Sequence, residues 1–391
     1  MLCDMNEHAT SKTLRTLLVG TTLVVTGAVA VGSPTPIASA VDADEITCFD
    51  TDAPAGAGVV VNGTAAAPGG SGYLNFYNPD ASGDPTETSS VNFAPGSAVA
   101  NSVVTPVTSG EICVYNSEGV EIIADVAGWI APDKLLSFFE LDGVTPRGAI
   151  RVFDTRGSNR KYSPSEDFCF NPAGNSRAGQ PTFINVTIAA AESNGFVNIY
   201  PNGADEPDAN SVINFSAGRN VANGVTVVTG VDSEICIYSS AVAHVIIDAV
   251  GALQNEEFTP ANEDNTAERV LNTRDSSPFE AEEVRCVATV AEPGESVVLN
   301  ATTFGASGNG FLNVYSSDAT ADPALNSTVN FRLGATVANG TIVPAGEDGE
   351  ICVYASAGTQ AIIDVAGYLT PGTFVPLNAD GSATRVLNTR G

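Results

Sequence analysis

Short runs of hydrophobic residues alternate along the chain with clusters of Gly, Asn, Asp, Ser and Pro. The runs are rich in Val, Ile, Phe and Tyr, a pattern that predicts β-strands bounded by turns. In Phe196–Tyr200 the alternation puts Phe196, Asn198 and Tyr200 on one face of a strand and Val197 and Ile199 on the other. Helical periodicity is not evident after the N-terminal segment. The pattern therefore predicts an all-β protein.

The strand-like runs occur three times in the same order, which marks an internal repeat. One run, Gly-aromatic-x-Asn-x-Tyr, lies at residues 72–77, 195–200 and 310–315. Another, an Ile-Ile run with an aspartate, is apolar on both faces, as expected of a central strand. Each copy is followed by a motif of the form Arg-Val-x-x-Thr-Arg. We expect three tandem β-sandwich or barrel-like domains, at residues 41–157, 158–275 and 276–391.

The cysteines follow the same repeat. Apart from Cys3, the chain has six cysteines, two in each copy at nearly equal separations. The repeat symmetry predicts one disulfide per unit in an oxidising compartment. A zinc site is disfavoured, because the two thiols of each unit have no repeated histidine beside them. The predicted pairs are Cys48–Cys113, Cys169–Cys236 and Cys286–Cys352.

The first forty residues have the composition of a secretory signal peptide. Lys12 and Arg15 precede an apolar run, Leu17–Val31, and a small-residue site follows at Ala38-Ser39-Ala40. A membrane anchor is the alternative, but the run is short for a span and contains Gly and Thr. Residues 1–40 are therefore predicted to be a signal peptide. We expect an exported protein, secreted or at the cell surface, without a membrane span after cleavage.

Charge excludes several classes of partner. The chain has 45 acidic and 16 basic residues, a net charge of −29. Such a chain repels nucleic acid and anionic membranes, so we expect neither as a partner. Acidic loops follow the Gly-aromatic strand and could bind Ca²⁺, but their spacing differs in each unit and matches no calcium-loop pattern. We expect solvated loops, with Ca²⁺ as the alternative ligand; the residues are Asp80, Asp84 and Glu87, then Asp205, Glu206 and Asp208, then Asp318 and Asp322.

The motif arginines are the sharpest candidate site in a chain so poor in basic residues. Two guanidinium groups could hold a carboxylate, phosphate or sugar acid. We favour a structural alternative, in which they pair with the aspartates of the apolar Ile-Ile runs, since an unpaired buried carboxylate is too costly. The arginines are Arg151, Arg156, Arg269, Arg274, Arg385 and Arg390, and the aspartates are Asp125, Asp248 and Asp364.

Catalytic residues are not evident in the repeat. After the signal peptide the chain has one histidine, His244, which is not repeated, and the cysteines are assigned to disulfides. A Ser or Cys nucleophile needs a base, and no Gly-rich phosphate loop is present. We therefore predict a non-enzymatic protein with no catalytic residues, resident metal or cofactor.

Several stretches of the second unit resemble a repeat found in exported proteins of bacteria, typically actinobacteria. They are Asn185–Thr187, Gly195–Pro201, Ile213–Gly218 and His244–Gly251, together with the Arg-Val-Leu-Asn-Thr-Arg motif. The third unit resembles it well and the first least. Family members usually carry the arginine motif at the start of the unit, so the boundaries above could shift by one motif.

The resemblance implies location and architecture but no reaction. We expect a secreted, non-enzymatic structural or binding protein at the cell surface or cell wall, whose partner is a cell-wall glycan or an extracellular protein. The alternatives are an extracellular hydrolase of glycans or peptides and a cation-binding extracellular protein.

Overall fold

The computed structural model describes residues 41–390 except 82, 97, 138–148, 159, 165–167, 173–177 and 206–209. The predicted signal peptide lies outside these residues, as do Glu206 and Asp208 of the second acidic loop. Residues 38–391 form one compact unit. A search of the described residues for a helix long and apolar enough to cross a membrane finds none.

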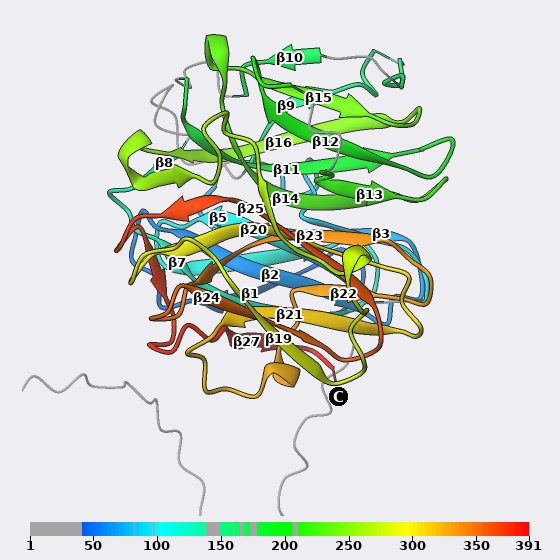
Figure 1. The fold of residues 1–391 in the computed structure, drawn as a ribbon. Helices are drawn as coiled ribbons and strands as arrows, with labels where there is room; N and C mark the ends of the chain where they lie inside the picture. The colour runs from blue at the N-terminus through cyan, green and yellow to red at the C-terminus, as the bar shows by residue number, and fades with distance from the viewer. Residues whose placement is uncertain are drawn as a thin grey trace, which may run out of the picture. The chain divides into compact units, whose positions relative to one another are not determined.

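The prediction of an all-β protein is confirmed (Figure 1). Strands form six sheets, two for each copy of the repeat. Among the described residues the helical elements are single 3₁₀ turns: η2 (Val231–Ser233), η3 (Asn255–Glu257), η4 (Thr273–Asp275) and η5 (Pro323–Leu325). We refer to residues 45–130, 168–253 and 283–369 as the first, second and third cores.

Each core has a four-stranded antiparallel sheet with the same strand order. In the first core it runs β1 (Glu45–Asp50), β6 (Glu111–Asn116), β3 (Gly72–Tyr77) and β4 (Val91–Phe93). In the second it runs β10 (Phe168–Phe170), β15 (Ile235–Ser239), β12 (Gly195–Pro201) and β13 (Ile213–Phe215). In the third it runs β19 (Glu283–Ala288), β24 (Glu350–Ala355), β21 (Gly310–Ser316) and β22 (Val329–Phe331).

Each core also supplies three strands of a five-stranded sheet, in which the strand with the Ile-Ile run lies between the core's middle strand and two short strands from elsewhere in the chain. These strands are β5 (Val99–Pro106), β2 (Gly58–Ala66) and β7 (Glu121–Ile130) in the first core. They are β14 (Val221–Val228), β11 (Pro181–Ala189) and β16 (His244–Leu253) in the second. In the third they are β23 (Val337–Pro344), β20 (Ser296–Phe304) and β25 (Gln360–Leu369).

Two short strands complete each five-stranded sheet, and they come from the segment that follows a different core. We call these segments the exchange segments. The first, β8 (Leu135–Ser137) and β9 (Ile150–Asp154), pairs with β16 of the second core. The second, β17 (Phe258–Pro260) and β18 (Glu268–Asn272), pairs with β25 of the third core. The third, β26 (Phe374–Pro376) and β27 (Thr384–Asn388), returns to β7 of the first core.

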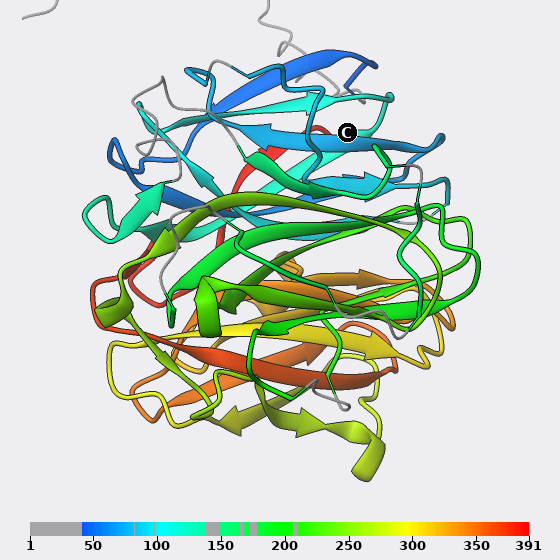
Figure 2. The ribbon, with the colours of Figure 1, turned by 90° about the horizontal axis from the view of Figure 1, so that it is seen from above.

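The exchange closes the three cores into a ring of pairings. Figure 2 shows the red strand of the third exchange segment among the blue and cyan strands of the first core. The unit boundaries taken from the sequence assign each exchange segment to the core that precedes it. In the structure, its strands pair with the next core around the ring.

Hydrophobic packing joins the cores as well. Each core buries its own apolar residues between its two sheets, as Val61, Leu74 and Ile112 do in the first. A further cluster draws residues from all three cores, including Val60, Phe183 and Val298. The three copies therefore share buried surface within one compact unit.

The strands β5, β14 and β23 contact one another where the cores meet. Backbones approach so closely that a Cβ on Gly224 would lie 1.9 Å from the carbonyl oxygen of Ser102. A Cβ on Gly340 would lie 2.1 Å from the carbonyl oxygen of Gly224. Glycine at these two positions is therefore required by the packing of the cores.

The three predicted disulfides are present, each joining the first strand of a four-stranded sheet to its neighbour. They are Cys48–Cys113, Cys169–Cys236 and Cys286–Cys352. Each staples an edge strand, which protects it from unpairing.

Candidate functional site: the arginine–aspartate junctions and their clefts

The first arginine of each motif lies opposite the aspartate of the central strand in the neighbouring core. Arg151 is in register with Asp248, Arg269 with Asp364, and Arg385 with Asp125. At each of these positions the register of the two strands shifts, as in a β-bulge. A bulge turns a side chain out of the regular alternation. Here it accompanies the turn of each arginine toward a carboxylate on the neighbouring strand.

All three pairs are bidentate and have the same geometry. The Arg Nε to Asp Oδ1 distance is 2.9 Å in Arg151–Asp248, 2.7 Å in Arg269–Asp364 and 2.8 Å in Arg385–Asp125. A second bond joins Nη2 to Oδ2 at 3.1, 3.0 and 3.0 Å. The aspartates are 1–4% exposed. Both carboxylate oxygens thus have charged donors in a setting where an unpaired carboxylate would be costly.

Burial and pairing act in opposite directions on these aspartates. Burial raises the pKa of Asp125, Asp248 and Asp364, and the hydrogen bond from the arginine lowers it, with burial the larger cause in each case. The pairs therefore hold the exchange strands in register more than they add net stability. Losing one partner would nevertheless leave a buried group unpaired.

Two of the arginines also bond to the core that precedes them in the chain. Arg269 Nη2 donates to Asn210 Oδ1 at 2.9 Å, and Arg385 Nη2 donates to the carbonyl oxygen of Leu325 at 2.7 Å. Each guanidinium group therefore links two neighbouring cores. Because its fork faces a protein carboxylate, the first arginine does not present that fork to an external anion.

The second arginine of each motif does not join the buried pair and has a different partner in each copy. Arg156 bonds to Asp154, with Nη2 and Oδ2 2.7 Å apart. Arg274 lies over the ring of Phe304, 4.7 Å from its centroid. Arg390 donates to Asn388 Oδ1 at 3.2 Å. The two arginines of one motif thus do not converge on a common ligand position.

A cleft lies at each junction between cores, beside the buried aspartate, and the three clefts differ in size. The cleft between the second and third cores, here the 2/3 cleft, has a volume of about 100 Å³ and includes Asp364. Its counterpart between the third and first cores, the 3/1 cleft, measures about 50 Å³ and includes Asp125. The 1/2 cleft measures about 20 Å³ and includes Asp248. A cavity of 20 Å³ holds a single water molecule, so of these three clefts beside a buried aspartate the 2/3 cleft has the most room.

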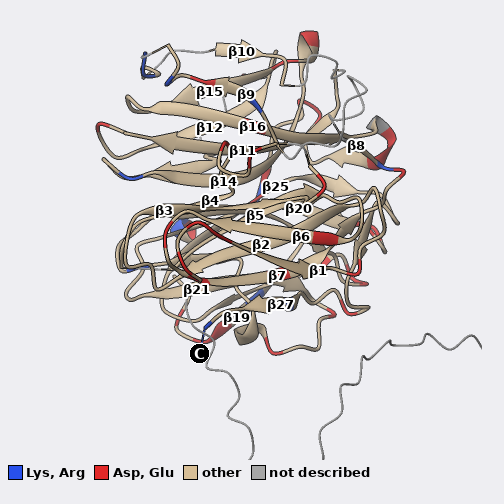
Figure 3. Cartoon of the chain, turned by 180° about the vertical axis from the view of Figure 1, so that it is seen from behind, with Lys and Arg blue, Asp and Glu red and all other residues tan. Residues whose placement is uncertain are grey.

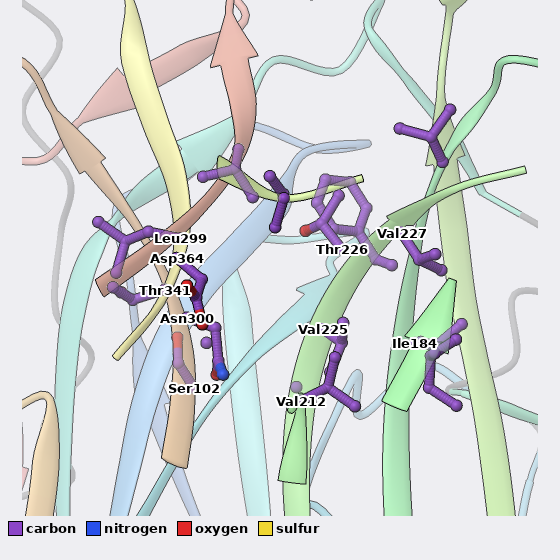
Figure 4. A pocket seen from close by; sticks show the side chains of 18 of the residues that line it. Ser102, Ile184, Val212, Val225, Thr226, Val227, Leu299, Asn300, Thr341 and Asp364 are labelled. Carbon is purple, nitrogen blue, oxygen red and sulfur yellow. The ribbon is translucent and has the colours of Figure 1, made fainter. Parts of the chain in front are cut away.

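The 2/3 cleft has two chemically different walls (Figure 4). Asn300, Thr341 and Asp364 of the third core lie together on one side. Aliphatic side chains of the second core, including Val212 and Val225, lie opposite. Such an arrangement suits a small molecule with one apolar face.

Val212 makes the wall of the 2/3 cleft more apolar than the equivalent position in the other copies. The equivalent residues in the other copies are Ser90 and Thr328, whose hydroxyl groups accept hydrogen bonds from the backbone N–H of Phe76 and Val314, at 2.9 Å each. Valine cannot accept such a bond. The second copy therefore has an apolar wall where the other two have a hydrogen bond.

Buried asparagines of the repeated Val-Ala-Asn run, which the sequence did not mark as functional residues, lie at the meeting point of the cores. The side-chain amide of Asn101 donates to Asn185 Oδ1 at 2.9 Å. The equivalent bonds, Asn223 to Asn300 and Asn339 to Asn62, are 3.0 Å each. The available signal was the asparagine of the repeated Val-Ala-Asn run, which recurs in an apolar setting.

The same asparagines connect the cores to the backbone of their neighbours. Oδ1 of Asn101 accepts from the N–H of Gly224, and Oδ1 of Asn223 accepts from that of Gly340, at 2.8 Å each. Oδ1 of Asn339 accepts from the N–H of Ser102 at 2.9 Å, which completes a cycle through all three cores. These bonds fix the relative register of the cores, because breaking one would leave buried amide groups unpaired.

The acidic loops use their carboxylates locally. Asp84 accepts bonds from Thr86, Asp318 accepts from the N–H of Glu347, and Asp322 accepts from the N–H of Ala324 at the start of η5. In the part of the chain that the structure describes, no group of three or more His, Cys, Asp or Glu side chains is placed to hold a metal ion.

His244 takes part in a contact that the other copies make with different residues. Its Nδ1 lies 3.1 Å from Thr155 Oγ1. In the third core, Thr273 donates to Gln360 Oε1 from the equivalent position. Both threonines also accept a bond from the backbone of the central strand. The contact between Thr155 and His244 thus has an equivalent in Thr273 and Gln360, where no histidine is present. This favours a structural role for the pair over a role as nucleophile and base.

Comparison with known proteins by sequence finds no matching family and no matching curated protein. Among solved structures, the chain is similar to an archaeal virus protein described by a triple jelly-roll fold and turret assembly, with 10% identity, 82% of each chain covered and a TM-score of 0.18. It is also similar to a capsid structure of Penaeus vannamei nodavirus, with 10% identity, 93% of this chain and 100% of the other covered, and a TM-score of 0.16. A Sulfolobus turreted icosahedral virus structure covers 83% of this chain and 84% of its own, with 9% identity and a TM-score of 0.19. These scores carry no functional argument.

Proposed function

We propose that the protein is a secreted, non-enzymatic structural and binding protein of the bacterial cell surface or cell wall, and a member of the exported repeat family that its second unit resembles. The observation that carries the proposal is the cyclic strand exchange, in which every core is completed by a segment from another. The three copies of the repeat then belong to one compact unit. Such a body holds several surfaces at fixed distances, which suits a scaffold or a multivalent binder.

The use of polar residues supports a role without catalysis. The recurring buried charges, from Arg151 and Asp248 to their counterparts, are engaged with one another in strand pairing. The repeated asparagines hold the cores together. The disulfides support an oxidising, extracellular location. We propose a cell-wall glycan or an extracellular protein as the partner, and the junction clefts as surfaces through which it is bound.

A pull-down of the chain from residue 41 onward tests the proposal. The matrices are purified bacterial cell wall and insoluble cellulose and chitin, each with and without Ca²⁺. We expect retention on at least one matrix and release by the soluble form of the same glycan. A reduced and alkylated sample serves as the control, since losing the disulfides should weaken retention by loosening the edge strands. Flow-through on every matrix would overturn a glycan partner.

A further inference from the structure

Three phenylalanine rings lie together at the edge of the second core, outside the junction clefts. Ring centroids of Phe153 and Phe168 are 5.3 Å apart, those of Phe153 and Phe170 are 5.2 Å apart, and those of Phe168 and Phe170 are 6.1 Å apart. The interplanar angles are 31° or less. Phe153 and Phe170 pack against the core, whereas Phe168 is 44% exposed. The cluster thus extends the core outward as an aromatic surface.

The other copies show that the fold does not need these rings. Phe153 comes from the motif that reads Arg-Val-Leu in the other two copies, where Leu271 and Leu387 replace it. Phe168 precedes the first cysteine of its core, a position held by Thr47 in the first core and Arg285 in the third. Phe168 packs on two other rings, but the equivalent strands form with Thr47 and Arg285 at this position. Its presence in one copy is therefore better explained by an interaction than by folding.

The residue that replaces Phe168 in the third core is fully engaged within the protein. Arg285 lies over the ring of Phe279, 4.3 Å from its centroid, and its Nε donates to Glu283 at 2.6 Å. In the third core, the side chain at this position is therefore engaged by contacts within the protein. In the second core, the same position carries an exposed aromatic ring.

A hollow of about 170 Å³ lies beside the rings, with Phe153 and Phe168 on its apolar side. Its polar side comprises Asp154, Thr155, Arg160 and Lys161. Figure 3 shows blue segments in the loop beside β10, on a chain with few basic residues. We call this hollow the aromatic pocket.

The polar side of the aromatic pocket consists of charged groups that are already oriented. The Asp154 carboxylate is held by Arg156, which lowers the pKa of Asp154 and keeps it ionised. Lys161 Nζ bonds to Glu192 at 3.0 Å. The carboxylate of Asp154 is a hydrogen-bond acceptor, and the charged nitrogen groups of Arg160 and Lys161 are donors, so the pocket offers both. A ligand with several hydroxyl groups can use them without bringing a charge of its own.

We propose that the aromatic pocket binds one pyranose unit of a glycan. A pyranose ring has an apolar C–H face that can cover a phenylalanine ring and a rim of hydroxyl groups that can bond to carboxylate and guanidinium groups. The volume suits a single ring, since pockets that enclose drug-sized ligands measure about 300–1,000 Å³. A cationic ligand is disfavoured, because Arg160 and Lys161 line the pocket. This inference rests on the proposed function and adds to the junction clefts a further binding surface with a stated ligand class.

The chain itself supplies conservative variants for the test. Phe153→Leu and Phe168→Thr introduce residues that equivalent positions of the other copies carry, so the second core should keep its melting temperature. Asp154→Asn introduces the residue found at 272 and 388. The control is Ile46→Thr, which removes an apolar side chain that is 48% exposed on β1 of the first core. Each variant is compared with the parent on cellulose, chitin and purified cell wall.

We expect a loss of at least tenfold in affinity for the retained glycan in Phe168→Thr, a smaller loss in Phe153→Leu and Asp154→Asn, and none in Ile46→Thr. Titration of a soluble oligosaccharide of the same glycan should shift the ring resonances of Phe153 and Phe168 in a sample with ¹³C-labelled phenylalanine. Equal retention of all variants, with no shift of these resonances, would overturn the aromatic pocket and leave the proposed function standing. Failure of the parent protein to bind any matrix would overturn both.

Discussion

The junction between the third and first cores and the other two junctions have the same local geometry but different places in the chain. Arg151 and Asp248 are 97 residues apart in sequence, and Arg269 and Asp364 are 95 apart. Arg385 and Asp125 are 260 residues apart, with bond lengths of 2.8 and 3.0 Å that match the others. Identical contacts therefore close loops of very different length.

The difference teaches that closing the ring has a small cost of its own. Loop-closure entropy grows slowly with length, so the longer loop costs about 1 kcal/mol more than the shorter ones. The bidentate pair itself is alike at each junction. We therefore expect the 3/1 junction to open first when the protein is destabilised, with the first core losing its exchange strands before the second and third cores lose theirs.

Deleting residues 374–391 should have the largest effect, because it breaks the 3/1 junction completely. The central strand β7 would lose β26 and β27, and Asp125 would be left buried and unpaired. We expect the first core to lose at least about 5 kcal/mol of stability and to unfold in a separate, earlier transition. Differential scanning calorimetry measures this. Adding Asp125→Leu to the deletion should recover part of the loss, and an unchanged single transition would contradict the ring closure.

Replacing one member of a buried pair should have the next largest effect. Arg269→Met leaves Asp364 buried without its donor and should cost about 3–5 kcal/mol. Asp364→Ala should cost less, because the side chain of Arg269 is 19% exposed and can turn toward water. Urea unfolding of the two variants compares them. The matched variant Arg385→Met at the 3/1 junction should cost about as much as Arg269→Met, because each removes the same bidentate pair and neither changes the length of a loop. A clearly different cost would contradict the likeness of the two pairs.

Val212→Thr should raise the stability of the protein modestly, whereas the preceding changes lower it. Threonine occupies the equivalent position in the third core, where its hydroxyl accepts from the N–H of Val314. We expect the variant to gain a similar bond to Ile199 and about 0.5–1 kcal/mol of stability. It should also make the wall of the 2/3 cleft more polar and so weaken binding of an apolar molecule there. A thermal melt together with binding of a neutral apolar dye would show both changes, and a lower melting temperature would contradict the assignment.

The smallest effect concerns pH at the 3/1 junction. Asp380, in the third exchange segment, accepts bonds from Ser382 and from Thr320 of the third core, and these bonds lower its pKa. A carboxyl whose folded pKa lies below the unfolded value of about 3.9 stabilises the fold above that pH and loses this contribution as the pH falls.

The variant Asp380→Asn should therefore flatten the decline in stability below about pH 4, by less than about 1 kcal/mol because the group is partly exposed to solvent. The control is Asp264→Asn at the 2/3 junction, whose carboxylate bonds to Thr266 in its own segment. A steeper acid decline in Asp380→Asn would contradict the role of this contact.

Local features of the fold were predictable because each depends on neighbouring residues. Alternation and turn residues identified the strands, and the repeat identified the three disulfides through the equivalent positions of their cysteines. The apolar Ile-Ile-Asp run was identified as a central strand, and its aspartate was expected to need a partner. The exposed ring of Phe168 was not noticed, since a single phenylalanine in a short strand gives no sign of its exposure.

The sequence by itself determined an all-β chain of three copies, the pairing of cysteines within each copy and the need of Asp125, Asp248 and Asp364 for a cation. Only the tertiary structure decided which arginine meets which aspartate. A strand can pair with any edge of suitable length. The sequence around Arg385 is therefore equally consistent with pairing to the third core, which precedes it in the chain. The choice follows from the closed ring, where β27 satisfies the open edge and buried charge of β7, a strand whose aspartate lies 260 residues away in the chain.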